Sequence, residues 1–69
     1  MYAIVINRIT STSYLKGFSK YGHPRCVFNI EDAKQYKSQD SAKKTLERIR
    51  EIHKADDKII SIDLEEISS

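Results

Sequence analysis

The chain has 69 residues, of which 39% are hydrophobic and 32% are charged. This composition excludes an intrinsically disordered chain, and the length allows a single domain over residues 1–69. No apolar run is long enough to span a membrane, and the amino terminus lacks the basic and then apolar order of a signal peptide. We therefore expect a cytoplasmic protein with no membrane partner.

Charge is distributed unevenly along the chain, although the formal net charge is only +2. The first thirty residues contain no acidic side chain, and their basic residues are Arg8, Lys16, Lys20 and Arg25. From residue 56 onward, Lys58 is the only basic side chain, and the acidic residues are Asp56, Asp57, Asp63, Glu65 and Glu66. This asymmetry predicts a molecule with a basic end and an acidic end.

The amino-terminal part of the chain predicts antiparallel strands. Residues 2–9 are rich in β-branched side chains, and residues 14–18 return as a second strand after a turn of hydroxyl residues at 10–13. Segment 17–24 contains both glycines and the only proline, so we expect the main irregular loop there. Side chains alternate again over residues 25–30, which predicts a third strand.

Residues 38–55 carry the clearest helical pattern, with apolar side chains at spacings of three and four residues. Ser38 is a suitable N-cap, because its hydroxyl can accept a hydrogen bond from a free backbone N–H. Asp56 and Asp57 would oppose the helix dipole, so the helix is expected to end at about Ala55. The expected buried stripe consists of Ala42, Leu46, Ile49 and Ile52 or His53.

Residues 58–67 alternate between apolar and polar side chains, which predicts a last strand. The residues expected to face the core are Ile60, Ile62 and Leu64, and those expected to face solvent are Ser61, Asp63 and Glu65. Strands on both sides of a single helix predict the α+β class. We expect a two-layer sandwich with a three- or four-stranded, mostly antiparallel sheet packed on one helix, in the order ββ(β)αβ.

One helix is too narrow to cover such a sheet. A helix is about 10 Å across, whereas four strands at a spacing of about 4.8 Å are about 19 Å wide. We therefore expect that nothing in the chain covers the second face of the sheet. The residues expected to line that face are Val5, Ile9, Ile59 and Ile67.

Candidate catalytic and metal-binding groups are few. His23 lies three residues before Cys26, the only cysteine. A histidine near a cysteine is the minimal arrangement for a thiolate nucleophile, but no nearby acidic residue would orient this histidine. In an apolar strand a free cysteine packs as a small hydrophobic side chain, and this is what we expect of Cys26. The spacing of His23, Cys26, His53 and Asp56 matches no zinc pattern. We expect no enzyme activity, no cofactor and no metal.

Segment 14–25 interleaves basic and aromatic side chains. Lysine and arginine neutralise phosphates, and exposed rings stack on bases, so this pattern is typical of single-strand nucleic-acid binding. It also fits a strand whose Tyr14 and Phe18 pack in the core. The candidate nucleic-acid-binding residues are Tyr14, Lys16, Phe18, Lys20, Tyr21, His23 and Arg25.

Several short motifs follow one another in the chain. It opens with Met-Tyr-Ala-Ile-Val-Ile, passes through Tyr-Leu-Lys-Gly-Phe and Asp-Ala-Lys-Gln-Tyr-Lys-Ser, and continues into Ser-Ala-Lys-Lys-Thr-Leu-Glu-Arg-Ile before one last strand. In this order and composition it resembles the small α/β proteins carried by phages and other mobile elements of low-GC bacteria. Several such proteins, anti-CRISPR proteins among them, inhibit host machinery by occupying a surface. The resemblance implies that mode of action and transfers no functional residue.

The lack of a catalytic set and the excess of sheet over helix favour a non-enzymatic protein-binding module. We expect a phage-type inhibitor that occludes a surface of a host nucleic-acid-processing complex, such as a CRISPR effector, which is a protein or ribonucleoprotein partner. The expected partner-binding residues are Asp63, Glu65, Glu66, Val5 and Ile59. The alternative is a small RNA- or DNA-binding protein that uses segment 14–25. A homodimer that pairs open faces or edge strands is compatible with either function.

Overall fold

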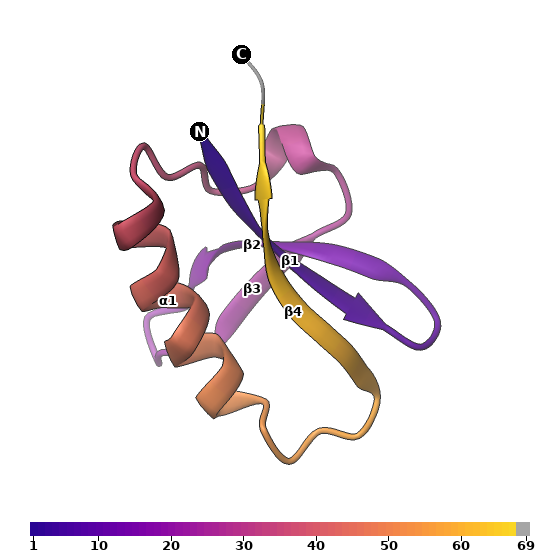
Figure 1. The fold of residues 1–69 in the computed structure, drawn as a ribbon. Coiled ribbons are helices and arrows are strands. Elements are labelled where there is room, and N and C mark those ends of the chain that lie inside the picture. Colours follow the sequence, from indigo (N-terminus) through magenta and orange to yellow (C-terminus); the bar gives the residue numbers. More distant parts are fainter. Residues whose placement is uncertain (68–69) are drawn as a thin grey trace.

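The computed structural model describes residues 1–67 as four strands, one α-helix and a short 3-10 helix. The elements are β1 (Tyr2–Arg8), β2 (Thr12–Phe18), β3 (Pro24–Val27), η1 (Ile30–Asp32), α1 (Gln39–Ile52) and β4 (Ile59–Glu66). The strands form one antiparallel sheet in the order β3-β2-β1-β4, and α1 lies on one side of it (Figure 1). This arrangement confirms the predicted α+β class, with the helix before the last strand.

The helix begins where the sequence predicts and ends three residues earlier. The Ser38 hydroxyl accepts a hydrogen bond from the backbone N–H of Ser41 at 3.2 Å, as an N-cap does. At the other end, the His53 N–H donates to the Ile49 carbonyl at 3.0 Å, and the chain then turns toward β4. Ile52 is therefore 46% exposed. Within residues 1–67, no helix is long and apolar enough to cross a membrane.

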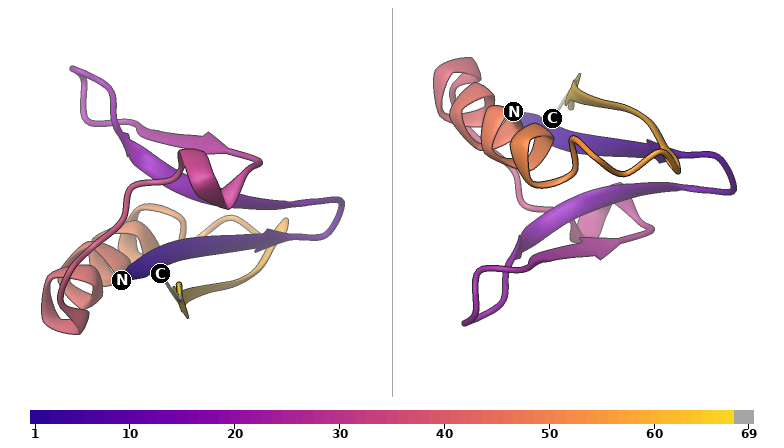
Figure 2. Two further views of the ribbon diagram at one scale, coloured as in Figure 1. Left: turned by 90° about the horizontal axis from the view of Figure 1, so that it is seen from above. Right: turned by 90° about the horizontal axis from the view of Figure 1, so that it is seen from below.

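A single hydrophobic core lies between α1 and the sheet. Its buried residues are Ile4, Ile6, Leu15, Leu46, Ile49 and Ile62, and the partly buried residues packed around them are Phe18, Tyr36, Ile59 and Leu64. The helix contacts β1 and β4, and the β2–β3 hairpin extends beyond it (Figure 2). The core is thus concentrated under the β1 and β4 half of the sheet.

A β-bulge changes which side chains of β4 face the core. Asn7 lies opposite Ser61 and Arg8 lies opposite Ile59, so Ile60 is an extra residue in the ladder. Ile60 is consequently 69% exposed, and Ile59 packs against the core in its place. The prediction that Ile60 faces the core was wrong, and so was the placement of Ile59 on the open face.

The third strand is shorter than the sequence pattern suggests. β3 ends at Val27, because the Asn29 side chain accepts a hydrogen bond from the Glu31 N–H at 3.0 Å and starts η1. β2 includes Gly17 and Phe18, so the irregular loop shrinks to residues 19–23. Gly22 has a φ of 82°, a left-handed value that glycine adopts without strain, and its N–H closes the turn on the Ser19 carbonyl at 2.9 Å.

Candidate functional site

The acidic residues of β4 lie along an outer edge of the sheet. Asp63 is opposite Val5, Glu65 is opposite Ala3, and Glu66 is opposite Tyr2. Because side chains alternate along a strand, Asp63 and Glu65 share the face away from α1, and Glu66 lies on the face toward it. All three acidic side chains are exposed. Asp63 and Glu65 therefore face away from the core as the alternation predicted, and Glu66 is exposed on the opposite face.

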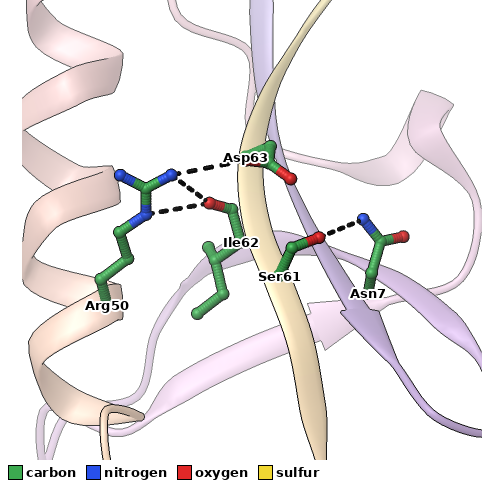
Figure 3. A network of polar contacts seen from close by, with 5 residues as sticks. All are labelled: Asn7, Arg50, Ser61, Ile62 and Asp63. Atoms are coloured by element: carbon green, nitrogen blue, oxygen red, sulfur yellow. Dashed lines mark hydrogen bonds and ion pairs between the residues drawn. The ribbon is translucent and has the colours of Figure 1, made fainter.

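The backbone of β4 has groups that point away from the sheet. The Ile62 carbonyl accepts hydrogen bonds from Nε and Nη2 of Arg50 at 3.0 and 2.7 Å, so it faces away from β1 (Figure 3). Tyr2 exchanges both of its backbone hydrogen bonds with Tyr36, at 2.8 and 2.7 Å, and so makes none with Glu66 opposite. In an antiparallel ladder, the N–H and C=O groups of successive residues point alternately toward and away from the neighbouring strand. The outward backbone groups are therefore those of Ile62, Leu64 and Glu66.

Arg50 protects part of this edge. Its guanidinium reaches from α1 to the Ile62 carbonyl and lies 3.4 Å from Oδ1 of Asp63 (Figure 3). Both side chains of that ion pair are 53% exposed, so its own contribution to stability is small. The bonded carbonyl is unavailable to another strand, which is a common way to protect an exposed edge.

The free part of the edge begins after Ile62. Within residues 1–67, Glu65 and Glu66 make no ion pair. The backbone of Leu64 and Glu66 faces outward, and Leu64 packs its side chain against the core. The edge thus combines unpaired carboxylates with main-chain donors and acceptors, which gives it the chemistry to bind a basic partner.

The face of the sheet away from α1 is less open than expected. The Asn7 side chain donates to the Ser61 hydroxyl at 3.0 Å and accepts from the Thr12 hydroxyl at 3.1 Å, so one row across three strands is polar and internally bonded. Ala3 on this face is fully buried, and Val5 is half-buried. The turn of η1 lies on this side of the strands and contacts β2 (Figure 1). The prediction that nothing in the chain covers this face was wrong.

The connection after η1 closes the gap between β1 and β2. Only residues Val5 to Asn7 of β1 pair with β2. The part of β1 before Val5 does not pair with β2, which leaves a gap between the two strands. Lys34 donates its N–H to the Leu15 carbonyl at 3.0 Å, and Tyr36 bonds to Tyr2. The segment from Lys34 to Tyr36 therefore fills the gap between the two strands before the chain enters α1. Ile9 and Ile67, also predicted for the open face, are 67% exposed and half-buried, respectively.

The basic and aromatic residues of segment 14–25 do not form one surface. Tyr14 pairs with Val5 on the face away from α1, whereas Phe18 packs against the core, with the Arg48 guanidinium 4.2 Å from its ring centre. Tyr21 is 76% exposed at the β2–β3 turn, and Nζ of Lys20 lies 5.1 Å from its ring centre. Lys16, His23 and Arg25 are exposed.

The charge asymmetry of the sequence has a counterpart in the sheet. The basic residues of the β2–β3 hairpin lie at one edge, and the acidic residues of β4 lie at the other, because β3 and β4 are the two outer strands. No acidic side chain occurs between residues 12 and 28. The two edges of the sheet therefore differ in charge.

The candidate nucleophile and metal ligands are not assembled into a site. Cys26 is exposed, contrary to the expectation that it packs as a small hydrophobic residue, because β3 lies beyond the reach of α1 (Figure 2). Among residues 1–67, no group of three or more His, Cys, Asp or Glu side chains could hold a metal ion.

A depression of about 360 Å³ at the β1–β2 turn is lined by Arg8, Ile9, Thr10 and Lys58.

Comparison with known proteins gave no relative. The chain matches no protein-family model, no curated protein and no solved structure. The feature of the chain's own geometry that bears most on function is the acidic outer edge of β4.

Proposed function

We propose that the chain is a non-enzymatic protein-binding module that occludes a basic surface of a host nucleic-acid-processing complex, such as a CRISPR effector, in the manner of a phage-type inhibitor. The observation that carries this proposal is the edge of β4, where Glu65 and Glu66 are exposed and make no ion pair within residues 1–67. Proteins that bind nucleic acid present lysine and arginine to phosphates. A row of carboxylates is complementary to the same surface.

The acidic residues of β4 contribute little to the stability of the fold and remain available to a partner. Asp63 has a partner in Arg50, but both side chains are half exposed, so an incoming arginine or lysine competes for the carboxylate. Glu65 lies opposite Ala3, and no side chain of β1 at that position neutralises it. Binding at this edge blocks the partner's access to nucleic acid without any catalytic step.

A charge-reversal experiment tests this function. The double variant Glu65→Lys/Glu66→Lys is compared with Glu31→Lys/Asp32→Lys, which changes the net charge equally at the exposed turn of η1. Each tagged protein is incubated with lysate of a bacterial host, and the retained proteins are quantified by mass spectrometry. We expect nucleic-acid-processing proteins to be retained by the wild type and the η1 variant, to be lost from the β4 variant, and to be displaced by added duplex DNA or RNA. Identical retention by all three proteins would contradict the proposal.

The second candidate function is direct nucleic-acid binding by the β2–β3 hairpin. It is favoured by the exposed ring of Tyr21 beside Lys20 and by the absence of acidic residues from segment 12–28. In that case, affinity for single-stranded RNA or DNA falls steeply with salt, and charge reversal at Lys16, Lys20 and Arg25 abolishes it. Phe18 is not part of this candidate surface, because it packs against the core.

A further inference from the structure

We infer that the outer edge of β4 is a strand-addition site for an extended, basic segment of a partner protein. This inference rests on the proposed function and specifies the conformation and sequence of what is bound. In strand addition, the main chain of an edge strand supplies the hydrogen bonds, and side chains on both faces select the partner. β4 offers free main-chain groups, carboxylates on one face and the partly buried Leu64 on the other.

The main chain defines the length of the site. Leu64 and Glu66 point their N–H and C=O groups outward, and so does the N–H of Ile62, whose carbonyl is bonded to Arg50. A partner segment of about five residues, roughly 17 Å long, spans the distance from Ile62 to Glu66. Arg50 and the bulge at Ile60 limit pairing beyond that point.

The side chains define the partner's sequence. Residues directly opposite one another in an antiparallel pair share a face, and opposite charges at such positions attract. Partner residues opposite Asp63 and Glu65 are therefore lysine or arginine, two positions apart. The residue between them lies opposite Leu64 on the α1 side, where an apolar side chain extends the core. The expected motif is basic, apolar, basic.

A second copy of the chain does not fit this edge. Antiparallel pairing of two β4 strands centred on Asp63, Leu64 or Glu65 places carboxylates directly opposite each other, and like charges at such positions are destabilising. Pairing centred on Ile62 needs two carbonyls that already accept hydrogen bonds from Arg50, and it sets each bulged Ile60 opposite Leu64 of the other copy. The complementary occupant is thus a different, basic chain.

Backbone methylation of a peptide tests strand addition separately from charge attraction. The probe is the capped peptide Val-Lys-Val-Lys-Val, titrated into the intact protein by calorimetry. In the expected register, the valine amides face β4 and the lysine amides face away. N-methylation of the central valine should therefore weaken binding at least about tenfold, because it removes a main-chain hydrogen bond and adds bulk at the contact. N-methylation of a lysine amide should leave the affinity unchanged.

Charge reversal in the protein completes the test. Glu65→Lys/Glu66→Lys should weaken binding of the unmethylated peptide, and Glu31→Lys/Asp32→Lys should not. Equal affinities of the two methylated peptides, or no binding of the unmethylated peptide, would overturn strand addition. Either result leaves the proposed function to be decided by retention from lysate, which needs no particular backbone geometry. The proposed function is overturned only if the wild type, the β4 variant and the η1 variant retain the same proteins from lysate.

Discussion

Replacing Ile49 with alanine is expected to destabilise the fold by about 2–5 kcal/mol, the usual cost of truncating a large side chain in a packed core. Ile49 is fully buried between α1 and the sheet. A domain of this length has a total stability of roughly 3–10 kcal/mol, so the variant should lose a large fraction of its stability and unfold at a much lower urea concentration. Urea unfolding followed by circular dichroism measures the change.

Ile52 provides a matched control on the same helix. It is 46% exposed at the last helical position, and Ile52→Ala should change the free energy of unfolding by less than about 1 kcal/mol. Equal losses at Ile49 and Ile52 would show that the helix continues to bury its stripe past Ile52, as the sequence pattern predicted.

Replacing Ile62 with alanine is expected to cost about 2–5 kcal/mol as well, whereas Ile60→Ala should cost less than about 1 kcal/mol. Ile62 is 6% exposed and Ile60 is 69% exposed, although they lie two residues apart in one strand. The Arg50 hydrogen bonds go to the main-chain carbonyl of Ile62 and remain in the alanine variant. The difference between the two variants therefore reports side-chain burial alone.

The same pair of variants tests the β-bulge. Regular alternation along β4 places Ile60 and Ile62 on one face, so an unbulged strand predicts similar losses for both. A large loss at Ile60, measured by the same urea unfolding, would contradict the bulge and the exposure of that side chain.

The main elements of the fold could be predicted from the sequence because their signals are local. Three apolar residues at helical spacing, Ala42, Leu46 and Ile49, identify the buried stripe of α1, and all three are buried. The Ser38 cap depends on a residue and an N–H three positions away. Alternation over residues 2–9 and 58–67 likewise identified β1 and β4.

The errors arose where distant segments decide the outcome. The bulge that exposes Ile60 depends on the register with Asn7 and Arg8, more than fifty positions earlier in the chain. The exposure of Cys26 depends on how far α1 reaches across the sheet, which no alternation pattern records. The segment around Tyr36 lies between β1 and β2, and its pairing with Tyr2 has no sequence signature.

The acidic residues of the candidate site could be predicted from the sequence, but their arrangement on the sheet could not. The acidic residues of the last strand are visible in the sequence, but three features of their setting are not. Those features are the edge position of β4, the division of Glu65 and Glu66 between two faces, and the bond from Arg50 to the Ile62 carbonyl. Together they change the candidate contact surface from an open sheet face to a strand edge.

Amide hydrogen exchange measured by NMR, with and without the Val-Lys-Val-Lys-Val peptide, tests the role of this edge most directly. In the free protein, the amides of Asp63 and Glu65 face β1 and should be protected, whereas those of Leu64 and Glu66 face outward and should exchange quickly. Saturating peptide should slow exchange at Leu64 and Glu66 selectively. Protection of these two amides before the peptide is added, or unchanged exchange at saturation, would contradict a strand-addition site on β4.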